Sequence, residues 1–330
     1  MEDPPGERPE FQHVPVLLAE SLQLLDLSPG VVCLDATLGG AGHSAAIGER
    51  ISPGGTLIGV DQDKEAIEAA RRRLTSLASI SILLVHSPFG ELDAALDALP
   101  NGESIRFDTA LFDLGVSSHQ LETDRGFSFR RDELLDMKMD ASDSSRQSAA
   151  ELLASASETE IARILWEYGD EQWSRRIAKR IVERRNQGEP LATTAQLATL
   201  IEQSIPRAAW PRNIHVATRS FQALRIAVND ELGQLRSGLQ AAFNRLKPGG
   251  RLVVISYHSL EDRIVKQMFA QWAGRTPSEY GSSPAALVPV SQSVPVASLL
   301  NKKPIAPNVD EIARNPRARS AKLRALQRNR

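Results

Sequence analysis

Only one cysteine, Cys33, occurs among the 330 residues, and aromatic residues make up just 5% of the chain. A single cysteine excludes intramolecular disulfides and metal sites built from several cysteines, and the apolar neighbours of Cys33 favour a buried thiol. No apolar run approaches the roughly 20 residues of a membrane-spanning helix, and residues 1–8 lack the apolar core of a signal peptide. We therefore expect a cytoplasmic protein without membrane contact.

Positive and negative charges nearly balance, and the formal net charge is −2. This total argues against a protein that holds nucleic acid by bulk charge. Residues 302–330 nevertheless contain nine Lys or Arg residues against two acidic residues, Asp310 and Glu311. Because a polyanion responds to such a local patch rather than to the total, nucleic acid stays open as a partner.

A glycine-rich loop follows the first apolar stretch of the chain. Residues 31–35 end in Asp35, three glycines follow between 39 and 42, and the next apolar stretch, 56–63, carries Asp61. Glycines after a strand let the backbone approach a ligand, and an acid about 20 residues further on suits the ribose hydroxyls of an adenosine. Asp35 would repel the pyrophosphate of NAD but suits a ligand with ammonium and sulfonium groups. The pattern therefore favours S-adenosylmethionine over NAD.

Apolar stretches and helical patterns alternate along the chain. Strands are predicted at residues 31–35, 56–63, 80–85, 107–114 and 251–256, and a helix at 63–74. Strands that alternate with helices indicate α/β class with a parallel, doubly wound sheet, whose ligand lies along the edge where the strands end.

The fourth and fifth strands are separated by far more residues than one crossover needs. Ser157 and Thr193 each begin a capping-box pattern, and the apolar residues that follow them have helical spacing. We therefore predict an inserted helical domain at residues 124–212 that overhangs the cofactor edge. Residues 1–123 and 213–330 then form the cofactor-binding domain.

The segment after the fifth strand has a different composition. Residues 272–296 are rich in Gly, Ser and Pro and are expected to form a loop. Residues 297–300 are predicted to pair with 320–326 as a closing antiparallel hairpin, although the Arg-rich second segment could equally be helical.

Seven motifs, in sequence order, are similar to those of one enzyme family. They lie at residues 35–44, 113–118, 125–129, 135–140, 217–226, 258–263 and 315–320. The stretch from His13 to about Arg328 thereby resembles the ribosomal RNA small subunit methyltransferase H family. The resemblance implies a class I methyltransferase with a Rossmann-like sheet and S-adenosyl-L-methionine as cofactor. It also implies methylation of the N4 amine of a cytidine in the decoding region of 16S rRNA, with the small ribosomal subunit as partner.

The resemblance further implies a set of cofactor-binding residues: Ala41, Gly42, His43, Asp61, Phe89, Asp113 and Gln120. Asp61 is expected to bind the ribose hydroxyls, and Phe89 either to cover the adenine face or to pack against the loop. Ala41 stands where the family often has glycine, and alanine fits there if its φ is negative. Tyr257 replaces a phenylalanine that is usual in the family.

Asp113 is the candidate catalytic residue. The exocyclic amine of cytosine is a poor nucleophile, so methyl transfer is helped by an acceptor that orients the amine and takes a proton. Asp113 could be this acceptor or could bind the cofactor alone. Many amine methyltransferases carry Asp/Asn-Pro-Pro-aromatic at this strand end, and this sequence does not. Asp136 or Asp140 could therefore contribute, unless they pair with nearby arginines, Arg130 or Arg131.

Arginines within the motifs are the candidate RNA contacts, for phosphate binding or base stacking. They are Arg125, Arg130, Arg219 and Arg225. A further basic set within residues 175–185 lies on the polar side of a predicted helix and could equally be a solvated face.

His258 is expected to face cofactor or substrate after the fifth strand. A hydrolase triad with Ser259 and Asp262 is disfavoured because this stretch has no G-x-S-x-G elbow. We predict no metal site, because the histidines are scattered along the chain.

Three alternatives stay open. One is a methyltransferase that acts on another nucleic acid, such as DNA cytosine; another is an NAD-dependent oxidoreductase, disfavoured by Asp35; the third is a non-catalytic RNA-binding protein with this fold. The sequence also leaves open whether the chain forms a homodimer, whether free RNA or an assembled subunit is the substrate, and which residue takes the proton.

Overall fold

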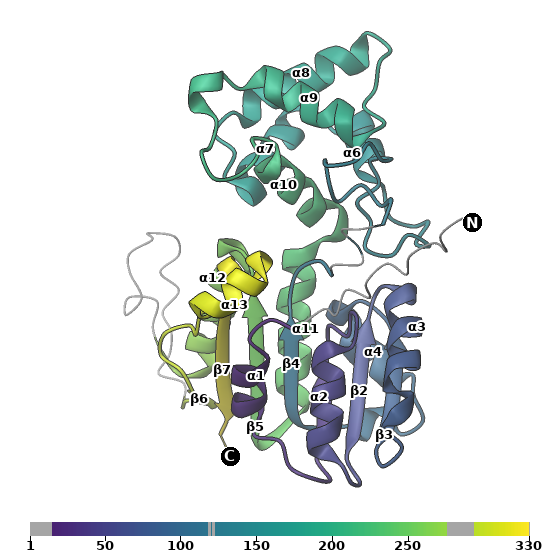
Figure 1. Ribbon diagram of the computed structural model, residues 1–330, viewed down its shortest axis with the longest axis vertical. Helices are drawn as coiled ribbons and strands as arrows, with labels where there is room; N and C mark the ends of the chain where they lie inside the picture. Colours follow the sequence, from purple (N-terminus) through teal and green to yellow (C-terminus); the bar gives the residue numbers. More distant parts are fainter. Residues whose placement is uncertain (1–14, 118–119, 121–122, 276–293, 330) are drawn as a thin grey trace, which may run out of the picture.

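The computed structural model describes residues 15–117, 120, 123–275 and 294–329, and within them the chain forms a seven-stranded sheet (Figure 1). The strands are β1 Val32–Asp35, β2 Thr56–Asp61, β3 Ser81–His86, β4 Phe107–Asp113, β5 Leu246–Ser256, β6 Ala297–Leu299 and β7 Lys322–Arg328. Their order is β3-β2-β1-β4-β5-β7-β6. Strands β1 to β5 run parallel, and β7 is antiparallel to both of its neighbours. The five predicted strands and the doubly wound α/β class are confirmed.

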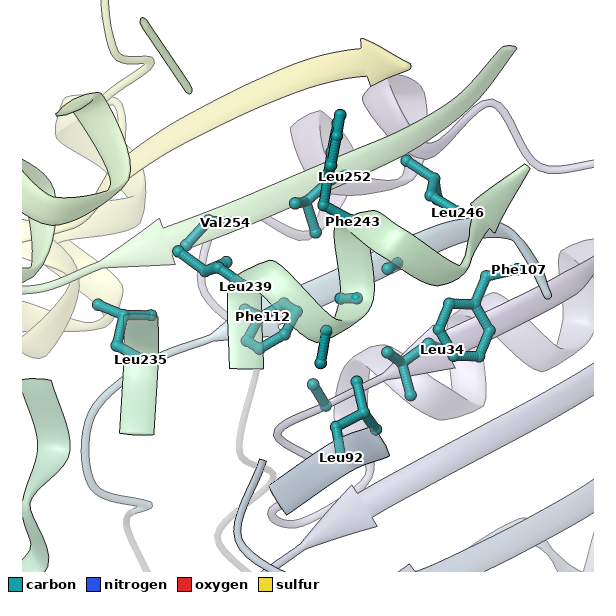
Figure 2. Close-up of a cluster of buried hydrophobic side chains, with 14 of the residues drawn as sticks. Leu34, Leu92, Phe107, Phe112, Leu235, Leu239, Phe243, Leu246, Leu252 and Val254 are labelled. Carbon is teal, nitrogen blue, oxygen red and sulfur yellow. The ribbon is translucent and has the colours of Figure 1, made fainter. Parts of the chain in front are cut away.

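Helices cover both faces of this sheet. On one face lie α1 Leu18–Leu25, α2 Gly42–Ile51 and α3 Lys64–Arg73, and on the other α4 Leu92–Asp97, α11 Glu231–Arg245 and α12 Ser259–Trp272. Strand side chains alternate between the faces: Cys33 and Leu111 join the first cluster, whereas Leu34 and Phe112 join the second. Figure 2 shows the second cluster, with Leu239 of α11 among the strand side chains. Cys33 is buried, as predicted.

The strand order places the ligand edge. The chain adds β2 and β3 on one side of β1 and then crosses to add β4 on the other side. Such a reversal leaves a crevice outside the carboxyl ends of the strands, where ligands bind in open α/β sheets. Residues that follow β1, β2, β4 and β5 therefore meet at one edge.

A helical part is inserted between β4 and β5 and lies beyond this edge (Figure 1). It contains α6 Ala149–Ser155, α7 Glu158–Gly169, α8 Ser174–Asn186, α9 Thr194–Ser204 and α10 Thr218–Asn229. Its own apolar core includes Ile161, Ile177 and Ile201. Thr193 closes a capping box with Gln196, as predicted, and the Ser157 side chain accepts the backbone N–H of Glu160.

The helical part extends beyond the predicted boundary at residue 212. Helix α10 contributes Phe221 and Leu224 to the core of the insert. It then runs directly into α11 through Asp230, whose φ of 48° turns the chain between the two helices. The sequence of α10 belongs to a motif and gave no sign of which core it joins.

The predicted C-terminal pairing is confirmed, with Ala297 opposite Arg328 and Leu299 opposite Leu326 in an antiparallel ladder. Strand β7 also pairs with β5, and α13 Val309–Arg314 separates β6 from β7. The Arg-rich segment is a strand because its backbone pairs with both β5 and β6 and its apolar residues are buried, and its arginines have partners of their own. Arg324 donates to Asp262 of α12 at 2.7 Å, for example.

Most of the predicted loop at 272–296 lies outside the described residues. Helix α12 reaches Trp272, where that prediction begins. Among the residues that the structure describes, no helix has the length and apolar character of a membrane span.

Candidate functional site

A cavity of about 400 Å³ opens at the carboxyl edge of the sheet. Ligand pockets are typically about 300–1,000 Å³, so this one has room for a nucleoside-sized molecule. Six of the seven predicted cofactor residues border it: Gly42, His43, Asp61, Phe89, Asp113 and Gln120. Residues from α10, α11 and the β5–α12 turn line its other walls, together with Asn315, Arg317 and Ser320.

The glycine loop forms one wall of this cavity. The backbone N–H of Gly39 donates to the Asp61 carboxylate at 2.7 Å, and Gly39 has a φ of +47°. A Cβ at Gly40 would meet no atom within 4 Å, so the backbone there borders open space. Gly42 begins α2, and a Cβ at this position would lie 2.5 Å from Pro15 Cγ. Glycine is therefore required at residue 42 by close packing.

The condition under which alanine fits at residue 41, a negative φ, is not met. Ala41 has a φ of 56°, in the left-handed region, where a Cβ costs about 1–2 kcal/mol. Its side chain is fully buried in the apolar cluster beneath the loop, and its N–H donates to the Leu38 carbonyl at 2.7 Å. Ala41 thus shapes the turn into α2, and the cavity is bordered by its neighbours.

Asp35 does not face the cavity as the sequence suggested. Its carboxylate is buried, accepts the Ser44 hydroxyl at 2.6 Å and accepts the Thr37 N–H at 3.2 Å. Burial raises its pKa, partly opposed by the hydrogen bond from Ser44. Asp35 therefore joins β1 to the first turn of α2, whereas Asp61 and Asp113 do border the cavity.

Asp61 lies at the end of β2, partly buried beneath the loop. Its two oxygens accept backbone N–H groups, Oδ2 from Gly39 at 2.7 Å and Oδ1 from Asp63 at 2.8 Å. Burial nevertheless raises the pKa of Asp61 to about 6. Each carboxylate oxygen keeps a second lone pair, so this group can still accept hydroxyl donors from a ligand.

Phe89 lies at the cavity and packs against the sheet domain. It borders the cavity, and its ring meets Phe112 edge to face with centroids 5.8 Å apart. Helix α11 approaches it so closely that a Cβ at Gly238 would lie 2.7 Å from the Phe89 carbonyl oxygen. A ring held in this way provides a flat apolar wall.

Arg125 is turned toward the interior. Its guanidinium donates to Asp63 at 2.6 Å and to Glu65 at 2.6 Å, and its side chain is only 8% exposed. Gln120, which borders the cavity, donates to the same Asp63 carboxylate at 3.2 Å. Asp63 in turn caps α3, so Arg125 ties the start of the insert to the sheet domain. The structure therefore gives Arg125 internal partners in place of the predicted phosphate.

The other predicted arginines differ in position. Arg130 and Arg219 are exposed on the helical part. Arg225 borders the cavity and holds both oxygens of Glu231, at 2.7 and 2.8 Å. Burial lowers the pKa of Arg225, but the Glu231 carboxylate outweighs this and the net direction is upward.

Neither Asp136 nor Asp140 pairs with Arg130 or Arg131 in the described residues. Instead, Asp136 Oδ1 lies 3.9 Å from Lys138 Nζ, and Asp140 Oδ2 lies 3.3 Å from His86 Nε2.

Asp113 is held from two sides at the end of β4. The Tyr257 hydroxyl donates to Oδ1 at 2.8 Å, and His43 Nδ1 lies 3.4 Å from Oδ2. His43 Nε2 faces the Val16 carbonyl at 3.2 Å, and a carbonyl oxygen only accepts, so Nε2 carries a proton. A proton is then also needed between Nδ1 and Asp113. Burial lowers the pKa of His43, yet the Asp113 carboxylate outweighs it and the pKa is raised.

Sequence reasoning noticed Tyr257 only as a replacement for phenylalanine and gave it no role. The sequence held one signal for it: the predicted fifth strand ends at residue 256, and parallel strands end at the same edge as Asp113. In the structure Ile255 of β5 is the register partner of Asp113. Burial and the nearby carboxylate raise the pKa of Tyr257 well above its usual value. Its hydroxyl therefore stays protonated and remains a donor to Asp113.

A charged cluster lies at the cavity wall beside Tyr257, formed by Arg225, Glu231, His258 and Glu261. Ligand atoms of the last three lie within 4.8 Å of one another, close enough for a cation. Arg225 already holds both oxygens of Glu231, and His258 Nδ1 accepts the Glu261 N–H, which leaves the imidazole proton on Nε2. A metal-bound histidine donates through its second nitrogen instead. We therefore assign no metal to this cluster, in which Arg225 and Glu231 form an ion pair.

The model of the MraW methylase family matches residues 10–329. The chain belongs to this family. Relatives named Ribosomal RNA small subunit methyltransferase H include one from Geobacter sulfurreducens, 49% identical over 96% of this chain and 99% of the relative. Another, from Pelobacter propionicus, is 46% identical over the same shares of the two chains.

Solved structures also resemble this MraW-family chain. They include an rRNA methylase from Streptococcus thermophilus, with a TM-score of 0.39, 11% identity and coverage of 94% of this chain and 95% of that one. TrmN from Thermus thermophilus has a TM-score of 0.41, 11% identity and coverage of 94% and 48%. These TM-scores are too low to support a functional conclusion, so membership of the MraW family rests on the family model and the relatives.

As a MraW-family protein the chain is a class I methyltransferase, and S-adenosylmethionine is its cofactor. The residues at the cavity fit this molecule. Asp61 can accept hydroxyl donors, Phe89 offers a flat apolar wall, and the open backbone at Gly40 permits close approach. The Asp113 carboxylate supplies the negative charge that suits a sulfonium or ammonium group, which is the role the sequence suggested for Asp35.

Affinity of the MraW-family enzyme for S-adenosylmethionine should fall at acid pH. The anionic form of Asp61 accepts hydroxyl donors, and its pKa of about 6 means that it is protonated below pH 6. The Kd should therefore rise about tenfold for each pH unit below 6 and be level above about pH 7. Asp61→Asn should bind roughly ten- to a hundredfold more weakly at pH 8, with a flatter pH profile. Calorimetric titration across this range tests both, and a wild-type Kd that is unchanged down to pH 5 would contradict the assignment.

Proposed function

We propose that this methyltransferase acts on the N4 amine of a cytidine in the decoding region of 16S rRNA, in the small ribosomal subunit of the cytoplasm. The observation that carries the proposal is the Asp113 carboxylate at the cavity, held by Tyr257 and His43. The similarity to Ribosomal RNA small subunit methyltransferase H over nearly the whole chain supports the choice of RNA.

The chemistry that this site must provide follows from the group that accepts the methyl, the cytosine amine. The lone pair of the cytosine amine is delocalised into the ring, so the amine reacts only when it is oriented and can lose a proton. S-adenosylmethionine supplies an electrophilic methyl group on a sulfonium, which departs as a neutral thioether. Asp113 accepts an N–H of the amine, orients the nitrogen and takes its proton as the C–N bond forms.

Asp113 is prepared for this task by its neighbours. The Tyr257 hydroxyl fixes one oxygen, and His43 lies beside the other. The backbone N–H of Asp113 donates to Thr37 Oγ1 at 2.6 Å, which fixes the end of β4 against the glycine loop. Each oxygen retains a lone pair for the substrate amine.

The helical part supplies the surface for the RNA. Arg130 and Arg219 are exposed on it, and α8 carries a further exposed basic set of Arg175, Arg176 and Lys179. Exposed cations bind phosphates without reading sequence and fix the orientation of the nucleic acid. We assign phosphate binding to these residues, because Arg125 and Arg225 already hold carboxylates.

Salt dependence should report this contact. If about six phosphates are neutralised on single-stranded RNA, the logarithm of the association constant should fall with the logarithm of salt with a slope of about −4. Arg175→Gln should make the slope shallower by about 0.7. Fluorescence anisotropy with a 16S rRNA fragment measures both, with Arg106→Gln, at the opposite end of β4, as the control. A slope near zero would contradict an RNA substrate.

The reaction itself is tested with labelled cofactor. The purified protein is incubated with S-adenosylmethionine carrying a labelled methyl group and with small ribosomal subunits from cells that lack the enzyme. Nucleoside mass spectrometry should then find the label in N4-methylcytidine. Label in DNA cytosine instead would favour another nucleic acid as substrate, and tight cofactor binding without label would favour a non-catalytic RNA-binding protein.

A further inference from the structure

His258 and Glu261, at the turn between β5 and α12, border the cavity. His258 caps α12, and its Nδ1 accepts the backbone N–H of Glu261, so the proton of the neutral imidazole is on Nε2. Glu261 Oε2 accepts the backbone N–H groups of Tyr257 at 2.8 Å and His258 at 3.2 Å. The remaining donor is thus His258 Nε2, and the remaining acceptor is Glu261 Oε1.

His258 Nε2 and Glu261 Oε1 lie 3.1 Å apart but are not aligned to form a hydrogen bond with each other. The side chains are 10% and 4% exposed, and His258 Nε2 is a buried atom without a hydrogen-bond partner in the described part of the chain. Nearly all buried donors in folded proteins have an acceptor. A fixed donor beside a fixed acceptor at a cavity wall has the form of a ligand site.

We propose that His258 and Glu261 read the Watson–Crick edge of the target base. Glu261 Oε1 accepts an N–H of the exocyclic amine, and His258 Nε2 donates to the adjacent ring nitrogen. The inference depends on the proposed function in that the base is cytosine, whose edge presents an amine donor at N4 beside an acceptor at N3. It adds the residues that select the base.

This arrangement distinguishes bases by the order of donor and acceptor on their Watson–Crick edge. Uracil presents an oxygen where cytosine has its amine and an N–H where cytosine has its acceptor, so both contacts would become repulsive. Guanine is reversed in the same way, whereas adenine presents the same two groups as cytosine. His258 and Glu261 therefore distinguish bases with an exocyclic amine from bases with a carbonyl at that position. Cytosine and adenine both carry the amine, so the site must distinguish them by the size of the ring system.

The charge of Glu261 suits this role. Burial raises its pKa, but His258 and the backbone donors outweigh burial, and the net pKa is lowered. Glu261 therefore stays a carboxylate, which only accepts. Arg225 lies within the same cluster and helps to hold this charge.

The site is also connected to Asp113. Tyr257 joins the two, because its backbone N–H donates to Glu261 and its hydroxyl donates to Asp113. An amine has two hydrogens, and an arrangement with one bonded to each carboxylate would fix the plane of the base. Asp113 then takes the proton, and Glu261 is a specificity-determining contact.

The test uses nucleotide binding to the complex with S-adenosylhomocysteine, which needs no turnover. Cytidine 5′-monophosphate and uridine 5′-monophosphate are titrated separately and followed by NMR. The wild type should prefer the cytidine nucleotide by about tenfold or more, the discrimination expected from a two-contact base readout. Glu261→Gln should abolish this preference, because the amide oxygen takes the place of Oε2 in the cap and the NH₂ group replaces the Oε1 acceptor.

Matched variants separate specificity from folding. Glutamine also closes capping boxes, and His258→Asn keeps a good cap while removing the Nε2 donor. His258→Asn should therefore lose the preference but keep its thermal midpoint and its affinity for S-adenosylmethionine. Glu151→Gln alters the equivalent position of the Ser148 capping box, away from the cavity, and should keep the wild-type preference.

Equal or undetectable binding of the two nucleotides by the wild type would overturn the proposal, as would a preference that survives in Glu261→Gln. Failure of the proposed function is distinguishable. In that case the wild type would prefer the cytidine nucleotide but leave ribosomal subunits unlabelled.

Discussion

Asp113→Asn should lose methyl transfer by about 10²–10⁴-fold, the usual contribution of a positioned proton acceptor. The amide has the shape of the carboxylate and can accept from the Tyr257 hydroxyl, so the end of β4 should keep its geometry. The loss should appear in kcat with ribosomal subunits, measured by nucleoside mass spectrometry. Binding of S-adenosylmethionine, measured by calorimetry, should weaken because a negative charge is lost at the cavity, but by a smaller factor than kcat.

A control lies on the same strand. Asp108, at the opposite end of β4, accepts from the Val32 N–H and from Lys247, and Asp108→Asn should leave kcat unchanged. If Asp113→Asn transfers methyl at the wild-type rate, Asp113 is a cofactor contact alone, which the sequence left open. If it loses cofactor affinity and turnover equally, the same conclusion holds.

Arg125→Gln should destabilise the fold by about 3–5 kcal/mol, because it leaves buried carboxylate charge without its partner. The affected groups are Asp63, which is 4% exposed, and the hydrogen bond from Arg125 to the Met139 carbonyl. The variant should unfold at a lower denaturant concentration, followed by circular dichroism.

Arg163→Gln is the matched comparison for this measurement. Arg163 bridges Glu160 and Glu167 on the exposed side of α7, and exposed pairs contribute about 1 kcal/mol or less. Equal losses of unfolding free energy in the two variants would show that the ion pairs of Arg125 stabilise the fold no more than the exposed ion pairs of Arg163. A normal fold with weakened RNA binding in Arg125→Gln would restore the phosphate role that the sequence suggested.

Strands and edge residues could be predicted because they depend on local patterns. Apolar runs that end in an acid placed Asp61 and Asp113 at the carboxyl edge, and parallel pairing brings them to one cavity. The partner of a charged side chain is not a local property. Asp63 and Arg125 are separated by 62 positions, and the pattern around Arg125 was equally compatible with an exposed phosphate ligand.

Two further misses have related causes. Ala41 adopts a positive φ because the turn from β1 into α2 and the packing beneath it impose that conformation, against the preference of alanine. Asp35 was placed at the loop mouth by its position in sequence, whereas the Ser44 hydroxyl in the first turn of α2 draws its carboxylate inward. In both cases tertiary contacts decide what the residue type leaves open.

The pairing of β7 between β5 and β6 has a consequence for biosynthesis. Asn315, Arg317 and Ser320 follow every other cavity-bordering residue in the sequence, and β7 supplies the antiparallel neighbour of β5. While the chain is being translated, β5 emerges with an unpaired edge, and the cavity lacks one wall until these residues leave the ribosome. The nascent chain therefore acquires a complete cofactor site only after residues 315–320 have left the ribosome, on the same kind of particle that we propose it modifies.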